Sequence, residues 1–518
     1  MPWQTSAGPA TGQGSRTAGA RQTSETAAAP AHPPGVFFEA SAPFALLDYF
    51  RVPYVQTPPR GDAPPAGVAT LSLDGGRALL SWPTQTTLTA ARRQPAAYML
   101  DSIPVFGRLA SQSQMRAWLG SSGDRWSAGD EVRAEDGTVA GAIWRRDDGS
   151  AFLPFDPNEL ITNFWSERYL EYVRPAAVSR LTGLSRRGYY RARPLLPRSF
   201  QMSMRRRFSR LQSRARFPRW PTETALHDLY SFLFALLTAA TSEPIPYIAP
   251  WPRNWSWALV LTHDVETQVG YDHLSDLLEL ELEAGYRSSW NFVPRSRYTV
   301  DDKVLRSLRE QGFEIGVHGL YHDGRDISSL GTLRRRLPAI RAYAERWQAR
   351  GFRSPGTLRS AALMPLLGFE YDSSFSDTAP FEPQAGGCCT WLPYMLGDLV
   401  ELPITLVQDH TLFDLLAHQD ERMWIDKTHF LRDRGGMALF LTHPDYVGGG
   451  HLVDAYRRVL DEFAGDTTAW KALPAEVSEW WRRRSHSNLQ RNNGDWCVVG
   501  PAEGEARIEF VTPRSPTG

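Results

Sequence analysis

The sequence predicts an α/β protein with a mainly parallel sheet, open or closed into a barrel, in its C-terminal half and a smaller mixed α/β domain before it. From residue 257 onward, strand-like apolar runs alternate with amphipathic stretches at helical spacing, which is the pattern of a parallel sheet covered by helices. Polar side chains directly follow several of these runs. The 518 residues exceed one ordinary core, so we expect at least two domains.

The composition is that of a globular protein without a charge bias. Hydrophobic residues make up 42% and charged residues 22% of the chain, and 57 basic side chains balance 57 acidic ones. We therefore expect no nucleic-acid partner. Three cysteines cannot build a disulfide framework, the N-terminus lacks a secretory pattern, and the most apolar run, 229–240, falls short of the ~20 residues that cross a bilayer. A cytoplasmic location is the expectation.

The chain divides into five predicted regions. Large apolar side chains are scarce in the first region, which predicts disorder because too little surface can be buried to offset the loss of chain entropy. The regions are a disordered tail (1–35), a mixed α/β domain of unknown role (36–178), an arginine-rich linker with a buried helix (179–250), a catalytic domain (251–485), and a β appendage with a tail (486–518).

The linker carries the strongest local charge. Thirteen arginines and no acidic residue lie between Arg180 and Arg219. One interpretation is a weak contact with an anionic surface through Arg205, Arg206 and Arg207. The other, which we prefer, is a solvated linker helix, because charge runs are weak evidence for binding. Nothing in the sequence indicates an oligomeric state.

The predicted catalytic domain has six strands and four long helices. Each assignment follows from apolar runs of strand length or from helical periodicity. The expected strands are 257–262, 288–293, 313–317, 351–353, 399–403 and 437–442, and the expected helices are 272–284, 301–311, 327–350 and 421–434. A terminal amphipathic helix ending near Arg484 is expected to close the domain.

Metal-ligand side chains follow two of the expected strands. His318 and His322 stand at i and i+4, so a helical turn at the strand end would place both imidazoles on one side. Asp264 or Glu266, after the first strand, would add an oxygen ligand. Three protein ligands leave coordination positions for water and substrate, which is typical of a catalytic site.

At four places in the second half, the chain resembles the polysaccharide deacetylase family, also called the NodB homology family or carbohydrate esterase family four. The family's Thr-Phe-Asp-Asp motif is similar to residues 261–266 (Leu-Thr-His-Asp-Val-Glu), and its His-Ser/Thr-x-x-His motif to His318 through His322. An Arg-x-Pro motif is matched at Arg353, and a Leu-x-x-His motif resembles the segment ending at His443. The resemblance spans roughly residues 251–484.

The resemblance implies a distorted (β/α) barrel, a divalent metal ion, usually Zn²⁺, and hydrolysis of the N-acetyl group of an amino sugar. It makes Asp264 the general base, held by Arg353, and His443 the proton donor to the leaving nitrogen. These roles fit the chemistry, because an amide carbonyl is a poor electrophile that needs polarisation and an activated water.

The first motif departs from the family's pattern, because Val265 separates the two carboxylates. Either Asp264 is the base and Glu266 the metal ligand, or Asp264 binds the metal and the base is lost or lies elsewhere; the first arrangement is slightly preferred. The residue that orients His443 is not recognisable, and Asp372 and Asp409 are both candidates.

Two further residues flank matched positions. His263 and Asp445 would either line the pocket or serve ordinary hydrogen bonding. The predicted function is hydrolysis of a carbon–nitrogen bond other than a peptide bond, with an N-acetylated glycan as substrate. The alternatives are a hydrolase of a small non-sugar amide and a catalytically weak glycan-binding protein on the same fold.

Overall fold

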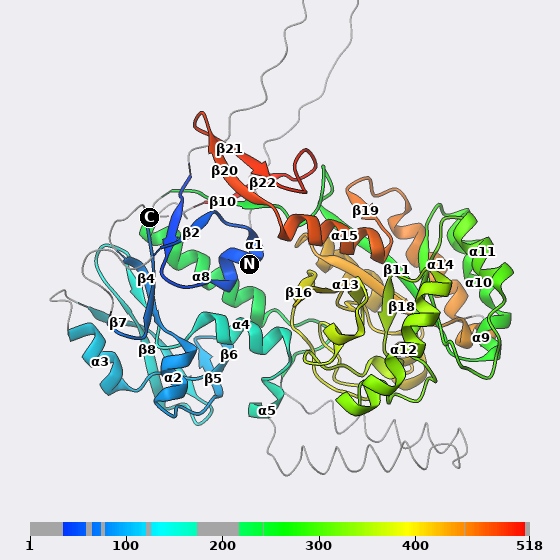
Figure 1. The fold of residues 1–518 in the computed structure, drawn as a ribbon, viewed down its shortest axis with the longest axis horizontal. Coiled ribbons are helices and arrows are strands. Elements are labelled where there is room, and N and C mark those ends of the chain that lie inside the picture. Colours follow the sequence, from blue (N-terminus) through cyan, green and yellow to red (C-terminus); the bar gives the residue numbers. More distant parts are fainter. Residues whose placement is uncertain are drawn as a thin grey trace, which may run out of the picture.

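The computed structural model describes residues 35–57, 65–73, 78–120, 126–173, 217–241, 243–449 and 451–512. Two nine-stranded sheets and two small two-stranded sheets form the framework, so the prediction of a mixed α/β protein is confirmed. Figure 1 shows one large sheet in each lobe, with helix α8 (Ala225–Thr241) beside the first. The predicted tail, except Gly35, and the arginines at 205, 206 and 207 lie outside the described residues.

The first sheet is mostly antiparallel and has the order β2-β1-β3-β4-β9-β8-β7-β5-β6. Only the pairs β1–β2 and β4–β9 are parallel. Its strands are β1 (Phe38–Ala40), β2 (Tyr54–Gln56), β3 (Val68–Leu73), β4 (Ala78–Pro83), β5 (Ala96–Leu100), β6 (Ile103–Gly107), β7 (Ser127–Ala134), β8 (Val139–Arg145) and β9 (Ala151–Phe152). Its helices are α1 (Ala45–Phe50), α2 (Gln85–Ala90), α3 (Gln112–Gly120), α4 (Pro157–Trp165) and α5 (Leu170–Val173).

The second sheet is almost entirely parallel and has the order β16-β17-β15-β14-β13-β12-β11-β18, with β19 also paired to β11. Only β16 and β17 run antiparallel. Its strands are β11 (Trp257–Val265), β12 (Ser288–Phe292), β13 (Glu314–His318), β14 (Gly351–Arg353), β15 (Tyr371–Asp372), β16 (Tyr394–Leu396), β17 (Leu399–Glu401), β18 (Met437–Thr442) and β19 (Ala469–Lys471). All six predicted strands are present, and β11 and β18 begin with the continuous apolar runs that are typical of parallel strands buried on both faces.

Strand β11 is longer than predicted. The prediction ended it at Thr262 because His263 and Asp264 are polar, but the strand continues to Val265 and all nine of its residues are buried. Both polar side chains have partners inside the protein. Asp264 therefore lies on the strand itself, at its carboxyl end, rather than on a loop after it.

The helices of the second lobe agree with the sequence except in two places. The predicted helix 272–284 is divided into α9 (Gln268–Asp272) and α10 (Leu274–Glu283), and α14 (His451–Ala464) was not predicted. The remaining helices are α11 (Asp302–Glu310), α12 (Leu330–Trp347), α13 (Arg422–Arg432) and α15 (Pro474–Ser485). Helix α15 is the predicted terminal helix, and it buries Trp480 and Trp481.

The closure of the second sheet into a barrel remains a prediction. The order of pairing places β16 at one end of the sheet and β18 at the other, and within the described ranges no ladder joins the two sides. The chain after β17 does approach β18, because the amide of Leu406 donates to the carbonyl of Leu439 at 3.2 Å. The carboxyl ends of β11, β13, β14 and β18 lie on one edge of the sheet, since these strands run parallel.

One hydrophobic core runs through both lobes. It includes Trp82 of the first sheet, Tyr230 of α8 and Trp290 of the second sheet. At the C-terminus, β20 (Asn488–Asn492) and β21 (Asp495–Val499) form a hairpin, and β22 (Ile508–Val511) pairs with β10 (Ile245–Ile248). In the part of the chain that the structure describes, no helix combines the length and apolar character needed to cross a membrane. The predicted domain boundaries remain predictions.

Candidate metal site

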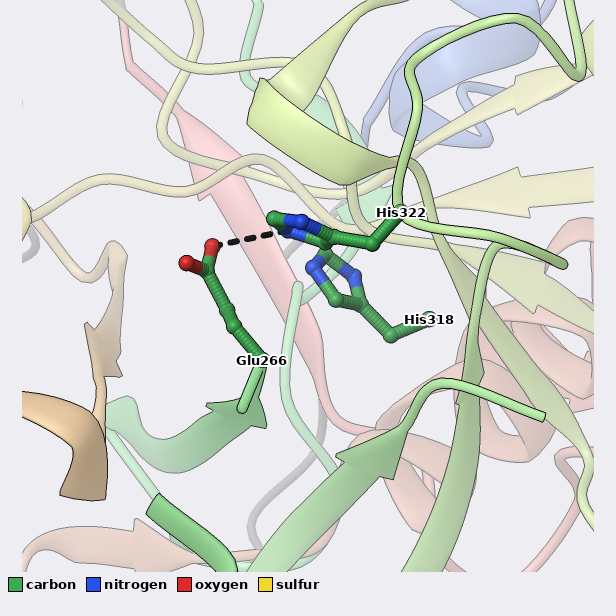
Figure 2. Close-up of side chains that lie close together, drawn as sticks. All are labelled: Glu266, His318 and His322. Atoms are coloured by element: carbon green, nitrogen blue, oxygen red, sulfur yellow. Dashed lines mark ion pairs between the residues drawn. The ribbon is translucent and has the colours of Figure 1, made fainter. Parts of the chain in front are cut away.

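Glu266, His318 and His322 converge on one point at the edge of the second sheet. One ligand atom from each lies within 4.8 Å of those of the other two. Figure 2 shows the carboxylate of Glu266 facing the imidazole of His322, with His318 beside it. Glu266 directly follows β11, His318 is the last residue of β13, and His322 comes from the loop after β13. The strand ends thus bring together three side chains that lie up to 56 positions apart in the sequence, from 266 to 322.

The two histidines converge by a different route from the one predicted. The prediction assumed a helical turn after β13, but the segment 319–324 forms no helix. Gly319, His322 and Gly324 have φ values of +64°, +52° and +65°, so repeated left-handed residues fold the chain back. The imidazole centroids lie 5.1 Å apart. The two imidazoles are brought together by a loop with left-handed residues and not by the i, i+4 geometry of a helix.

The side chain of His318 is suited to bind a metal ion. Its Nδ1 atom lies 3.2 Å from the carbonyl of Arg353, while its Nε2 atom is buried and has no hydrogen-bond partner among the described residues. A carbonyl next to Nδ1 selects the tautomer whose Nε2 lone pair is available to a metal. Burial lowers the pKa of His318 to about 4, so the imidazole is neutral near pH 7, as a metal ligand must be.

Glu266 supplies the oxygen of the cluster. Its Oε1 atom lies 2.9 Å from Nε2 of His322. Burial by itself raises the pKa of Glu266. The charge and hydrogen bond of His322, together with the charges of His443 and His318, outweigh burial and hold this pKa well below its usual value. Two imidazole nitrogens and one carboxylate oxygen are a donor set typical of catalytic zinc sites, so the residues present fit a divalent ion.

Asp264 lies beside the cluster on the same strand but is not one of its three members. Asn291 of β12 donates to Oδ1 of Asp264 at 2.8 Å, and Nδ1 of His318 lies 3.6 Å from Oδ2. Burial raises the pKa of Asp264, but the charges of His318, Arg353 and His443 outweigh it and lower the pKa. Asp264 is therefore a carboxylate, free of protons, next to the candidate ligands.

Arg353, which the resemblance implied would hold Asp264, contacts this carboxylate only at long range. Its Nη1 atom lies 3.6 Å from Oδ1 of Asp264, which is an ion pair but too long for a hydrogen bond. Its Nη2 atom donates instead to the hydroxyls of Thr262 and Ser373, both at 3.0 Å. The amide of Asn291 makes the direct hydrogen bond to Asp264, and this residue was not singled out from the sequence. The sequence feature that could have pointed to Asn291 is a polar side chain within a predicted strand, and that strand is buried throughout.

His443 is held by Asp409, one of its two predicted partners. Nδ1 of His443 lies 2.6 Å from Oδ1 of Asp409, whose Oδ2 accepts the backbone amide of His443 at 2.6 Å. Burial lowers the pKa of His443, but Asp409, Glu266 and Asp264 outweigh it and raise the pKa to about 10. Asp372, the other candidate, accepts instead from the hydroxyl of Ser374 at 2.8 Å.

His263 and Asp445 do not belong to the three-residue cluster. The imidazole of His263 lies 2.8 Å from the Thr442 hydroxyl and 2.7 Å from the Glu281 carboxylate. Asp445 accepts the backbone amides of Glu266 at 3.0 Å and of Thr267 at 2.9 Å. His263 thus lies in a buried network of its own, while Asp445 fixes the backbone from which the Glu266 side chain extends.

Comparisons with known proteins give structural neighbours only. No family model and no curated protein matches the chain. A Mycobacterium smegmatis protein named as a polysaccharide deacetylase is similar with a TM-score of 0.38 and 21% identity, over 47% of this chain and 98% of that one. A Pseudomonas aeruginosa protein with the same designation gives 0.36 and 17%, over 44% and 92%. An allantoinase gives 0.36 and 16%, over 45% and 92%.

Proposed function

We propose that the protein is a divalent-metal-dependent hydrolase of carbon–nitrogen bonds other than peptide bonds, which removes the N-acetyl group of an amino sugar in a glycan. The observation that carries the proposal is the cluster of Glu266, His318 and His322, in which the buried Nε2 of His318 has no partner among the described side chains. Zn²⁺ is the proposed ion because of the nitrogen and oxygen donors. The sugar substrate follows from the motif resemblance alone.

Two groups beside the cluster supply acid–base chemistry. When bound, a divalent ion would polarise the amide carbonyl and lower the pKa of water. Asp264, whose pKa is lowered, is a carboxylate and accepts the proton of the attacking water. His443, with a pKa raised to about 10, is protonated and donates to the departing nitrogen. Because Asp409 holds Nδ1 of His443, Nε2 is the atom that donates.

The first prediction tests the metal site. The wild-type chain should bind one equivalent of zinc after reconstitution, and His318→Ala and His322→Ala should each lose it, because each removes one of the three proposed ligands. Both variants should also lose acetate release from a panel of N-acetylated oligosaccharides. His273→Ala is the matched control, because His273 is exposed and pairs with Asp276 on the surface. Elemental analysis measures the metal content, and an enzymatic assay measures acetate.

The outcomes separate the candidate functions. Wild-type protein that takes up no metal, or His318→Ala and His322→Ala variants that keep full occupancy, would show that the site is wrong. A metal-loaded protein that cleaves a small amide but no acetylated sugar would correct the substrate. Glycan binding without hydrolysis of any amide would support the binding-protein alternative.

A further inference from the structure

The N-terminal lobe contributes a buried carboxylate to the lobe that carries the metal site. Glu167, which follows helix α4, accepts two hydrogen bonds from Arg359: Nε to Oε2 at 2.8 Å and Nη2 to Oε1 at 2.6 Å. The two side chains are 3% and 0% exposed. A bidentate pair fixes the plane of the guanidinium as well as its distance. Glu167 lies between α4 and α5 of the first lobe, and Arg359 follows β14 of the second, so this pair joins the two lobes of Figure 1.

Glu167 is itself rigidly held. Its backbone has a φ of +57°, which a residue other than glycine keeps only where its surroundings enforce it. A Cβ added to Gly386 would come within 3.0 Å of the Glu167 carboxylate, so the second lobe approaches closely here. The hydroxyl of Tyr169, two residues after Glu167, donates to the carbonyl of Gly387 at 2.7 Å. The carboxylate therefore has a fixed position relative to the second lobe.

Arg359 directly follows residues 353–358, a short segment that packs against the loop with His322. The segment begins at Arg353, whose carbonyl lies 3.2 Å from Nδ1 of His318. A Cβ added to Gly319 would come within 2.6 Å of the Pro355 ring, and one added to Gly324 within 2.8 Å of the Leu358 side chain. Residues 353–358 thus contact the last residue of β13 and, at two points, the loop after it, on both sides of His322.

Arg359 also ties the far end of this segment to its surroundings. Its Nη1 atom donates to the carbonyl of Thr357 at 3.0 Å, and its backbone amide donates to the side chain of Gln384 at 3.0 Å. Thr357, a β-branched residue, has a φ of +49°, a strained conformation that persists only where surrounding contacts support it. Glu167 provides that support, because it neutralises and orients the guanidinium.

We propose that Glu167 is a positioning residue for the metal site: through Arg359 it holds residues 353–358, which in turn hold the loop with His318 and His322. The mixed α/β lobe thereby acquires a role in the chemistry of the second lobe. The metal readout of this inference depends on the proposed function, whereas the mobility of the loop does not. Groups that orient metal ligands from outside the coordination sphere contribute strongly to affinity.

The test compares two buried carboxylates, one within helix α4 and one just after it. Glu167→Gln removes the negative charge of the proposed positioning residue. Glu159→Gln is the matched control, because Glu159 is also buried and pairs with an arginine, Arg108, but within the first lobe. Hydrogen–deuterium exchange of the metal-free proteins reports on residues 318–324 and 353–359, and competition with a chelator gives the Zn²⁺ affinity.

In the Glu167→Gln variant both segments should exchange about tenfold faster, because a charge-assisted contact that holds them is lost. Its Zn²⁺ affinity should fall about tenfold, and the absorption spectrum of the Co²⁺-loaded form should change. The Glu159→Gln variant should lose thermal stability but keep wild-type exchange in both segments and wild-type affinity. If Glu167→Gln does not fold, Arg359→Lys takes its place, since it keeps the charge but loses the bidentate geometry.

Exchange in residues 318–324 that is the same in Glu167→Gln and wild type would overturn the inference, even if thermal stability falls. A wild-type chain that binds no Zn²⁺ would instead overturn the proposed function. In that case the exchange rates still decide whether Glu167 holds the loop.

Discussion

His263 and Asp264 are neighbours in sequence, yet they serve different parts of the protein. Successive side chains of a strand point to opposite faces, so in β11 His263 bonds to Glu281 and Thr442 while Asp264 faces Asn291 and His318. The sequence placed both near a pocket because it ended the strand too early. Because β11 continues for three residues beyond Thr262, Asp264 and not His263 lies beside the candidate metal ligands.

The second prediction separates the roles of the two carboxylates. Asp264→Asn should keep zinc but lose turnover by a factor of about 10² to 10⁴, because it removes a general base and not a ligand. Glu266→Gln should weaken zinc binding, because it replaces an anionic oxygen in the cluster. Metal titration and acetate release at saturating zinc measure the two effects. Asp264→Asn that loses zinc while Glu266→Gln keeps it would exchange the two roles.

At the scale of elements, the approach of β12 to β13 lets Asn291 reach Asp264. Gly316 of β13 pairs in register with Asn291 of β12. A Cβ added to Gly316 would come within 1.9 Å of the Asn291 side-chain oxygen. Only glycine leaves room for the orientation in which the Asn291 amide donates to Asp264 at 2.8 Å. A residue without a side chain on one strand thus supports an acid–base group two strands away.

The third prediction follows from this packing. Gly316→Ala should displace the Asn291 side chain and lower kcat by about tenfold, because a hydrogen bond to a charged group contributes roughly 1.5–3 kcal/mol. Asn291→Ala should have a similar effect on kcat. Gly465→Ala is the control, because a Cβ there would meet no atom within 4 Å. Steady-state kinetics with the best substrate of the panel is the measurement, and unchanged kinetics in Gly316→Ala would refute the argument.

At the scale of the whole molecule, Glu314 connects the sheet to the C-terminal helix. Its carboxyl oxygens accept from the hydroxyl of Tyr371 in β15 at 2.7 Å and from the amide of Ala475 in α15 at 2.9 Å. Burial raises the pKa of Glu314 to about 7. The folded protein therefore keeps this proton over a pH range in which an unfolded chain releases it, and stability depends on pH through this group.

The fourth prediction gives the sign of that dependence. A folded-state pKa above the unfolded value of 4.5 means that the stabilisation is complete below pH 4.5 and is lost as the pH rises through about 7. The loss is about 3 kcal/mol, since each pKa unit corresponds to roughly 1.4 kcal/mol. Glu314→Gln mimics the protonated form, so it should raise Tm relative to wild type at about pH 8 and change it little at about pH 4.5. Thermal unfolding at both pH values is the measurement, and an equal shift at both would contradict it.

The positions of six strands and the residues of the candidate metal site were predictable from sequence. The six predicted strands are present, and β11 and β18 show the continuous apolar runs of buried parallel strands most clearly, which a local window detects. The predicted ligands His318, His322 and Glu266 come together because polar residues at the carboxyl ends of such strands share one edge of the sheet. The strand positions depend on neighbours within a few residues along the chain, and the shared edge follows from the parallel fold class that they predict, so the sequence by itself determined both.

Tertiary structure alone decided which distant residues support these groups. Asp409 rather than Asp372 holds His443 across 34 positions, Asn291 reaches Asp264 across 27, and Glu167 pairs with Arg359 across 192. Such contacts leave no periodic pattern, because they depend on how separate elements pack and not on local conformation. The left-handed loop that carries His322 was missed for a related reason: its path depends on tertiary packing, in which Pro355 lies against Gly319 and Leu358 against Gly324 while His322 between them keeps a positive φ.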